Sequence, residues 1–139
     1  MKNSELVVHF FESLWNKRQL DIIDQCFTLD AMICNPFNHK VGVMTMREVA
    51  DKWLTAFPDI DAKIDSVVAS GDDVILRWCA KGTHLGSFFS TQPTHQEVDY
   101  TGVTHCQCRD GKIFSYWALV DIHWILKQLQ LSSLEEAID

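Results

Sequence analysis

The fold is decided by residues 97–120, which read EVDYTGVTHCQCRDGKIFSYWALV. Both halves of this stretch are rich in valine, isoleucine, threonine and aromatic residues, which suit the pleated surface of a β-sheet. Arg109-Asp110-Gly111 separates the halves and is typical of a hairpin turn. The stretch therefore predicts two antiparallel strands, Glu97 to Cys108 and Lys112 to Val120.

The residues before this stretch extend the pattern. The same composition predicts strands at Lys63 to Ala69 and at Val74 to Thr83, with Gly71-Asp72-Asp73 as the turn between them. An apolar run from Ala31 to Cys34, stopped by Asn35-Pro36, predicts one more short strand. The second half of the chain is therefore expected to form a four-stranded antiparallel meander.

The first half of the chain and its C-terminal end have the spacing of helices. Apolar residues recur at helical intervals after Ser4, which can cap a helix that runs to about Lys17. Thr45 can cap a helix that ends before Pro58. Short helices are also expected at Gln19 to Cys26 and at about Ile122 to Gln130, and Ser132 with Glu135 offers a capping pattern for a final turn.

Helices followed by an antiparallel meander predict an α+β fold rather than an alternating βαβ fold. A curved sheet wrapped over helices would enclose a pocket that opens at one end. A chain of 16.0 kDa buries about two-thirds of its unfolded surface, which is enough for one core and too little for two. Residues 1–139 are therefore predicted to form one domain, with an acidic tail at about residues 132–139.

Charge and cysteine content narrow the partners and the compartment. Because 12 Lys and Arg stand against 19 Asp and Glu, the net charge is −7, and we expect neither nucleic acid nor a membrane surface as a partner. No run approaches the ~18 apolar residues that span a bilayer. The five cysteines are odd in number and lack Cys-x-x-Cys spacing, which predicts free thiols and a cytoplasmic protein.

Five Trp and eight Phe are a heavy aromatic content for this length. These side chains can fill an ordinary core or line a cavity for a flat apolar ligand, and composition leaves both alternatives open. The candidates for substrate-binding residues at such a pocket are Trp15, Trp53, Trp117, Tyr100 and His105.

Asp121 is the first candidate for chemistry, because it follows the apolar residues Trp117-Ala118-Leu119-Val120. A carboxylate at the end of an apolar strand would be partly desolvated. Desolvation favours the protonated form of a carboxyl group and suits it to exchange protons near neutral pH. The alternative is that Asp121 caps the following helix, and spacing alone favours this alternative.

His84, within Gly82-Thr83-His84-Leu85-Gly86, is the second candidate. On a regular strand it shares a face with Leu76 and Trp78, which directs the imidazole toward a core or a pocket. His105 lies on a strand whose faces are both mixed, so alternation does not fix its direction. Asp121, His84 and His105 could together form a proton-transfer cluster.

Other chemistries have no matching pattern. The sequence contains no His-x-x-x-His or His-x-His pair for zinc or iron, no glycine-rich phosphate loop and no Gly-x-Ser-x-Gly elbow. A site without metal or cofactor is the simplest prediction.

Six pieces of sequence stand in one order: Phe57-Pro58-Asp59, Gly82-Thr83-His84-Leu85-Gly86, Pro93-Thr94, Gly102-Val103, Asp110-Gly111-Lys112-Ile113, and Trp117 with Asp121. In this order and spacing the chain resembles the SnoaL-like (ester cyclase-like) polyketide cyclase family, of the ketosteroid isomerase and nuclear transport factor-like superfamily. The resemblance spans most of the chain and is densest from Phe57 to Asp121.

The resemblance implies a cone-shaped α+β barrel, in which N-terminal helices pack on a curved mixed or antiparallel sheet and enclose a pocket. It also implies a small hydrophobic molecule as partner and a homo-oligomer, either a dimer or a tetramer. In the characterised cyclases, the aspartate that matches Asp121 is the acid and base of an intramolecular aldol ring closure that needs no metal or cofactor. The histidine that matches His84 is expected near the pocket.

The chain departs from the family pattern at four positions, and these departures bear on the substrate. Tyr116 stands where the family often has histidine, and His95 replaces a glycine. His105 and Gln107 stand where the family commonly has an apolar residue and an arginine.

Three functions follow as hypotheses. The first is a cyclase- or isomerase-type enzyme that uses Asp121 and His84 on a hydrophobic, polyketide-like carbonyl compound. The second is a non-catalytic protein that binds a small hydrophobic ligand in the same pocket. The third is an interaction module that dimerises through the outer face of the sheet, where Arg77, Cys79 and Lys81 are expected.

Overall fold

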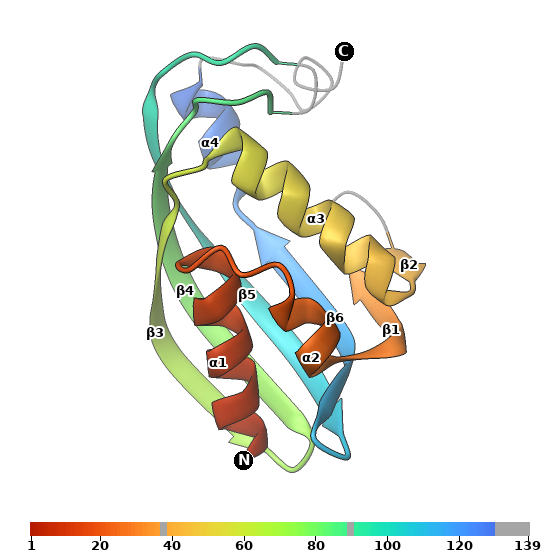
Figure 1. Cartoon of the computed structure of the whole chain (residues 1–139). Helices are drawn as coiled ribbons and strands as arrows, with labels where there is room; N and C mark the ends of the chain where they lie inside the picture. The colour runs from red at the N-terminus through yellow and green to blue at the C-terminus, as the bar shows by residue number, and fades with distance from the viewer. Residues whose placement is uncertain (37–38, 89–90, 130–139) are drawn as a thin grey trace.

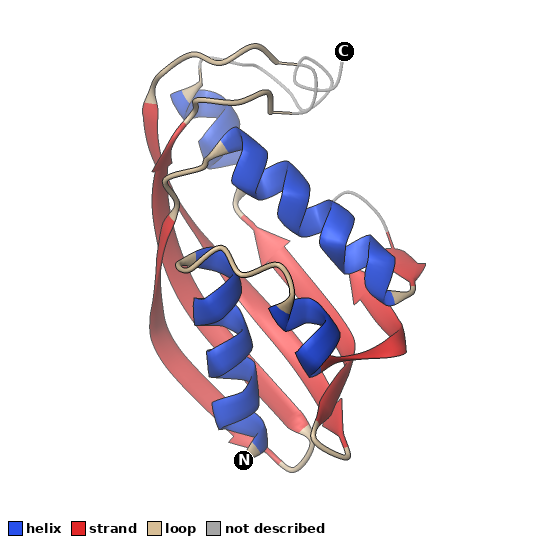
Figure 2. Ribbon diagram, viewed as in Figure 1, coloured by secondary structure: helices blue, strands red, loops and turns tan. Residues whose placement is uncertain are grey.

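The computed structural model describes residues 1–36, 39–88 and 91–129. Helices α1, α2 and α3 lie across one face of a single curved sheet (Figures 1 and 2). In chain order the elements are α1 (Asn3–Trp15), α2 (Ile22–Cys26), β1 (Phe27–Cys34), β2 (His39–Val41), α3 (Val43–Ala56), β3 (Asp61–Ser70), β4 (Asp73–Thr83), β5 (Glu97–Arg109), β6 (Lys112–Val120) and α4 (Ile122–Gln128). None of these helices is long and apolar enough to cross a membrane.

The predicted α+β order is confirmed. β6 has the predicted bounds, and β3, β4 and β5 extend the predicted strands by one or two residues at an end. β1 begins at Phe27 rather than at Ala31, and β2 was not predicted. The last helix ends at Gln128, and the cap expected from Ser132 and Glu135 lies outside the described residues.

The sheet is mixed and open. Its strand order is β2-β1-β6-β5-β4-β3, and every neighbouring pair is antiparallel except β1 with β6, which is parallel. β2 and β3 are therefore its edges. The expected barrel is not closed, because these two edge strands do not pair with each other.

Two predicted helix caps are not formed. α1 begins at Asn3, and its N-cap residue Lys2 makes no side-chain cap bond, so Ser4 already lies inside the helix. α3 begins at Val43 because Gly42 turns the chain with a φ of 113°. Thr45 is consequently a buried residue of the first turn rather than its cap.

Alternation along the strands places the core between the sheet and the helices. On β4, Val74, Leu76 and Ala80 face the helices and are buried, whereas Arg77 and Lys81 are exposed on the outer face. α1 packs on the inner face with a buried apolar stripe: Leu6, Val7, Phe10, Phe11, Leu14 and Trp15.

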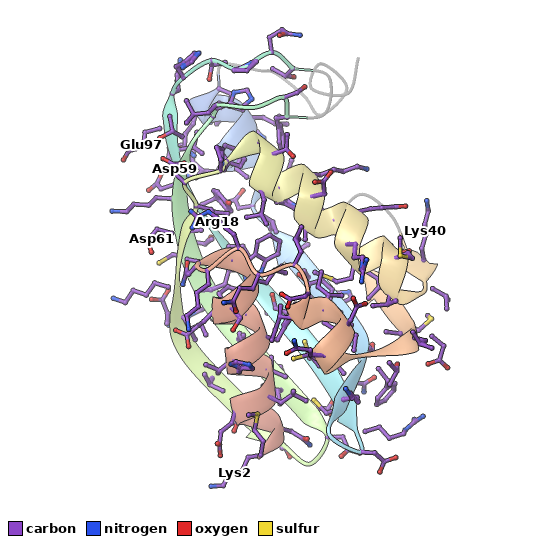
Figure 3. All side chains as sticks on the ribbon, viewed as in Figure 1. Lys2, Arg18, Lys40, Asp59, Asp61 and Glu97 are labelled. Carbon is purple, nitrogen blue, oxygen red and sulfur yellow. The ribbon has the colours of Figure 1, made fainter. Side chains whose placement is uncertain are left out.

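Polar side chains after α1 hold the edge strand β3 and the connection before it. The side-chain amide of Asn16 donates to the Ala62 carbonyl oxygen (2.8 Å) and accepts from the Ala62 N–H (2.7 Å). The Arg18 guanidinium donates to the carbonyl oxygens of Pro58 (2.6 Å) and Ile60 (2.9 Å). Figure 3 labels Arg18 beside this connection. These bonds satisfy backbone groups that an edge strand leaves unpaired.

The segment Gly82–Gly86 locks the end of β4 to the C-terminal end of α3. The N–H groups of Leu85 and Gly86 both donate to the Ala56 carbonyl oxygen, at 3.1 and 3.3 Å. A Cβ on Gly86 would lie 1.9 Å from the Thr55 carbonyl oxygen, so only glycine allows this approach. The glycine-rich segment thus has a packing role.

Asp59 adds a second contact to this lock. Its carboxylate accepts hydrogen bonds from the N–H and the hydroxyl of Thr83, each at 2.7 Å. Burial alone would raise the pKa of Asp59, but the hydrogen bonds from Thr83 outweigh it and lower the pKa below its ordinary value. The Phe57-Pro58-Asp59 and Gly82–Gly86 pieces of the resemblance are therefore in direct contact.

Gly86→Ala is expected to lower the free energy of unfolding by about 3 kcal/mol, because a backbone carbonyl occupies the space of the new methyl group. Gly71→Ala is the matched control. A Cβ there meets no atom within 4 Å, but the φ of 58° costs roughly 1–2 kcal/mol. Urea unfolding of both variants checks that Gly86→Ala loses more free energy of unfolding than Gly71→Ala. Equal losses would contradict the packing role of Gly86.

Candidate functional site

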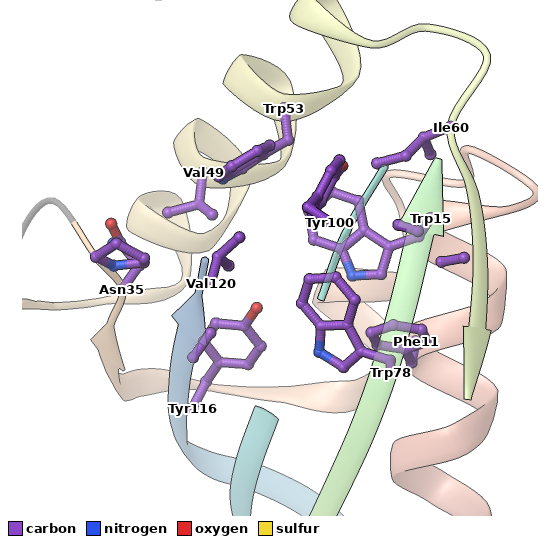
Figure 4. Close-up of a pocket in the computed structure, with 14 residues that line it drawn as sticks. Phe11, Trp15, Asn35, Val49, Trp53, Ile60, Trp78, Tyr100, Tyr116 and Val120 are labelled. Carbon is purple, nitrogen blue, oxygen red and sulfur yellow. The ribbon is translucent and has the colours of Figure 1, made fainter. Parts of the chain in front are cut away.

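An apolar cavity lies between the inner face of the sheet, the end of α1 and helix α3 (Figure 4). The described residues that line it carry no charged side chain: Phe11, Trp15, Asn35, Pro36, Val49, Trp53, Ile60, Ala62, Trp78, Ala80, Tyr100, Tyr116, Ala118 and Val120. The Gly82–Gly86 contact joins two of the elements that supply these side chains, α3 and β4.

The cavity is narrow. About 30 Å³ is open to the centre of a water-sized sphere, which holds a few water molecules at most. The total free space between its walls, together with the open solvent at its mouth, is about 450 Å³. The smaller value describes what fits without movement. A ligand with rings therefore requires side chains of the wall to move apart.

Aromatic contacts determine the shape of the wall. The Trp53 ring stacks on Phe57, with centroids 6.1 Å apart, and lies 5.7 Å from the ring of Tyr100. Tyr100 in turn meets Trp78 edge to face at 6.0 Å. If the wall side chains move apart, these flat rings would border a slot suited to a flat apolar molecule.

The five predicted substrate-binding residues separate into two groups. Trp15, Trp53 and Tyr100 line the cavity. Trp117 and His105 do not, because both lie on the outer face of the sheet, where Trp117 is 40% exposed. The pairing of His105 with Trp117 across β5 and β6 places them side by side there.

His105 has a polar partner on the outer face. Its Nε2 lies 2.8 Å from the Asp73 carboxylate, which also accepts a hydrogen bond from Gln107 at 3.1 Å. These two contacts lower the pKa of Asp73. Two departures from the family pattern, His105 and Gln107, thus bind the same carboxylate away from the cavity.

His84 is completely buried, beside the cavity wall rather than on it. Its Nδ1 accepts from the Thr94 N–H (3.1 Å) and lies 3.0 Å from the Thr94 hydroxyl. Its ring packs against Phe57 and Phe88, with centroids 5.9 and 6.4 Å away. Because Nδ1 accepts from a backbone N–H, the neutral ring carries its proton on Nε2.

Burial lowers the pKa of His84. The nearby backbone of Gly86 acts in the opposite direction, and the nearby charge of His95 lowers the pKa further. His84 is therefore a neutral side chain of the folded protein, which joins the end of β4 to Thr94.

Asp121 is exposed and caps α4. Its carboxylate accepts from the Trp124 N–H at 3.1 Å, as the alternative interpretation of its position predicted. The expected desolvation is absent, because Asp121 comes after the last residue of β6 and faces an open groove on the outer face. Asp121, His84 and His105 are not gathered at one cavity: His84 is buried inside, and the other two lie outside.

The outer groove beside Asp121 also contains Asp65, Arg77 and His123. Trp78 and Val120 line both this groove and the inner cavity. The Trp78 ring packs directly on Gly102, where a Cβ would lie 2.3 Å from the ring.

Sequence reasoning missed three aromatic residues of the cavity wall, Phe11, Trp78 and Tyr116. Trp78 was placed on the inner face by alternation but was not chosen for the site, and Tyr116 was noted only as a departure from the family. A signal existed for Tyr116. It pairs with the buried Cys106 on the inner face, two residues before the inward-facing Ala118.

Metal binding has no candidate in the described ranges, where no group of three or more His, Cys, Asp or Glu side chains is placed to hold an ion. All five cysteines lie within those ranges and are free thiols. Burial raises the pKa of Cys26, and the positive charge of Lys112 acts in the opposite direction and lowers it.

His84→Gln is expected to flatten the pH dependence of stability below about pH 6.5. The folded pKa of His84 is below its unfolded value near 6.5, so as the pH falls through this window the unfolded chain binds a proton that the folded chain does not. Stability is thus retained above pH 6.5 and lost below it. The slope of unfolding free energy against pH reports how many more protons the unfolded chain binds than the folded chain. In the variant, this number should fall by up to about one.

Urea unfolding at several pH values measures this slope. Gln keeps a side-chain acceptor for the Thr94 N–H, and the exposed His123→Gln is the control that should leave the slope unchanged. An unchanged slope in His84→Gln would contradict a neutral, buried His84.

Comparison with known proteins agrees with this architecture. AclR from Streptomyces galilaeus, a protein assigned as a hydroxylase, is 27% identical with a TM-score of 0.82, over 92% of this chain and 84% of AclR. IdmH from Streptomyces antibioticus, a proposed polyketide cyclase, is 26% identical with a TM-score of 0.80, over 94% of this chain and all of IdmH. A proposed SnoaL-like polyketide cyclase from Jannaschia sp. CCS1 shares the fold, with a TM-score of 0.85 at 21% identity, over 91% of this chain and 90% of that one.

No curated protein matches the chain by sequence. The family model for SnoaL-like polyketide cyclases, however, matches residues 5–129. This match covers all six described strands, helices α2, α3 and α4, and α1 from Glu5 onward, and so includes every residue named as lining the cavity. The chain belongs to the SnoaL-like polyketide cyclase family.

Proposed function

We propose that this protein is a cofactor-free cyclase- or isomerase-type enzyme that binds a flat, hydrophobic, polyketide-like carbonyl compound. The aromatic cavity with an uncharged lining carries the proposal, since it suits a flat apolar molecule and no charged group. Family membership supplies the reaction class, intramolecular aldol ring closure.

The reaction needs positioning and proton transfer. A base removes a proton from the carbon beside one carbonyl, that carbon bonds to a second carbonyl carbon of the same molecule, and the resulting alkoxide takes up a proton. Holding the two carbons together can supply ~7–11 kcal/mol of the barrier. Acid and base assistance contributes ~10²–10⁴-fold. A folded substrate in the slot beside Trp53 and Tyr100 would supply the first of these effects.

Asp121 is the proposed acid and base, with His84 as its partner. The family resemblance supports this assignment, and so does the position of Asp121 directly after Val120, a residue of the cavity wall. The role requires the Asp121 carboxylate to reach the substrate from its present place on the groove side, where it caps α4.

The second candidate is a non-catalytic protein that binds a small hydrophobic ligand in the same cavity. One observation favours it: neither Asp121 nor His84 is among the residues that line the cavity. Binding alone needs no proton transfer, so it requires only the apolar walls.

Ala118→Leu is expected to abolish binding of 2-acetylnaphthalene, because the added bulk projects from β6 into the narrow cavity. Ser115→Leu is the matched control, since it adds bulk to the outer face of the same strand, and it should bind like the wild type. Tryptophan fluorescence titration measures both affinities. Equal binding by Ala118→Leu and wild type would exclude the cavity as the site.

Asp121→Asn separates the two candidates. With the aryl diketone 1-(2-acetylphenyl)propan-2-one, the wild type should accelerate ring closure to the β-hydroxy ketone, which loses water and tautomerises to a naphthol, and the variant should lose at least ~100-fold of that rate. Asn keeps the cap of α4, so stability should stay unchanged, whereas Asp121→Ala should lose about 1 kcal/mol. Product fluorescence follows the reaction. An Asp121→Asn variant with wild-type rate would exclude Asp121 as the acid and base.

A further inference from the structure

Two phenols supply polar groups to an otherwise apolar cavity. Tyr100 comes from β5 and Tyr116 from β6, and both line the cavity. Figure 4 shows the Tyr116 hydroxyl directed into the space between Val120 and Trp78. The ring of Tyr100 lies on the other side of that space, and its hydroxyl points toward the end where Trp53 and Ile60 lie (Figure 4).

Tyr100 has a proton to donate and no acceptor. The residue is 3% exposed, and its hydroxyl makes no hydrogen bond with any of the described residues. A buried hydroxyl without a partner has lost its hydration and gained no hydrogen bond in exchange, which destabilises the folded protein. Contacts with Trp53, Phe57 and Trp78 hold the ring, so the hydroxyl cannot turn to solvent while the wall is intact. A ligand acceptor in the cavity would remove this cost.

Tyr116 is prepared as a donor by its neighbours. The Trp78 indole N–H donates to the Thr104 hydroxyl oxygen at 2.9 Å, which leaves the proton of Thr104 free to be donated onward. Burial raises the pKa of Tyr116, and the Thr104 side chain acts against that rise. Tyr116 lines the cavity, and its hydroxyl is directed into the free space (Figure 4), where it can donate to a ligand.

The protonation state of Tyr100 and Tyr116 limits the charge that a ligand of this cavity can carry. Burial raises the pKa of both, so both remain protonated donors throughout the pH range in which the protein is used. No side chain among the described lining residues is charged, and an anionic ligand would lose its hydration without gaining a cation. A ligand that satisfies this cavity is therefore uncharged and brings oxygen acceptors.

We infer that Tyr100 and Tyr116 are the two hydrogen-bond donors that bind and orient the ligand, and that the ligand is an uncharged, flat molecule with carbonyl oxygens. This inference rests on the proposed function, because it concerns the same cavity. It assigns polar recognition to Tyr116, a residue at which the chain departs from its family, and not to Asp121.

The test compares two probes of similar shape. One is 2,3-dimethyl-1,4-naphthoquinone, which has two carbonyl groups and blocked positions for thiol attack. The other is 2,3-dimethylnaphthalene, which has no carbonyl group. Dissociation constants for wild type, Tyr100→Phe and Tyr116→Phe are measured by equilibrium dialysis. Each variant is expected to bind the quinone about 3–10-fold more weakly, the loss of one neutral hydrogen bond, and the hydrocarbon with unchanged affinity.

Phe preserves the shape of each wall, so both variants should fold, and urea unfolding checks this. Tyr100→Phe is expected to be at least as stable as the wild type, since it removes an unpartnered hydroxyl. Wild-type affinity for the quinone in both variants, or an equal loss for both probes, would overturn the inference and leave cavity binding intact. Failure of the wild type to bind either probe would overturn the proposed function and the inference together.

Discussion

The cavity depends on one close approach between backbones, that of the Gly82–Gly86 segment to the end of α3. The Ala56 carbonyl, left without a helical partner at a C-terminus, accepts from two successive N–H groups of that segment. Gly86 makes the approach possible because it has no Cβ to meet the Thr55 carbonyl. This contact ties the C-terminal end of α3, the helix that carries Trp53, to the end of β4.

The same contact explains why the segment is a poor indicator of chemistry by itself. Thr83 is bound by Asp59, and His84 is bound by Thr94, so each polar side chain of the segment serves to close the end of the fold. In the sequence, His84 is a candidate catalytic group. In the structure its first role is to join two stretches of backbone, and any part in catalysis must be compatible with that role.

Much of the fold could be predicted from the sequence, because it follows from local rules. The hairpin at Arg109-Asp110-Gly111 and the alternation along β4 and β6 are short-range properties of the chain. The bounds of β6 and the inward direction of Trp78 followed from them. The caps at Ser4 and Thr45 could not be predicted in the same way, since a backbone turn at Gly42 and not a side chain determines where α3 begins.

By itself, the sequence determined the α+β class, the order of the elements and the aromatic supply for a cavity, since periodicity and turn residues act over a few positions. Only the tertiary structure decided which aromatic residues line that cavity. Trp53 and Tyr100 do, whereas Trp117 faces outward, because the sheet pairing fixes which face of each strand meets the helices. It also decided that Asp121 caps a helix and that Tyr116 presents a hydroxyl to the cavity, since each outcome depends on partners distant in the chain or on the direction in which the chain leaves a strand.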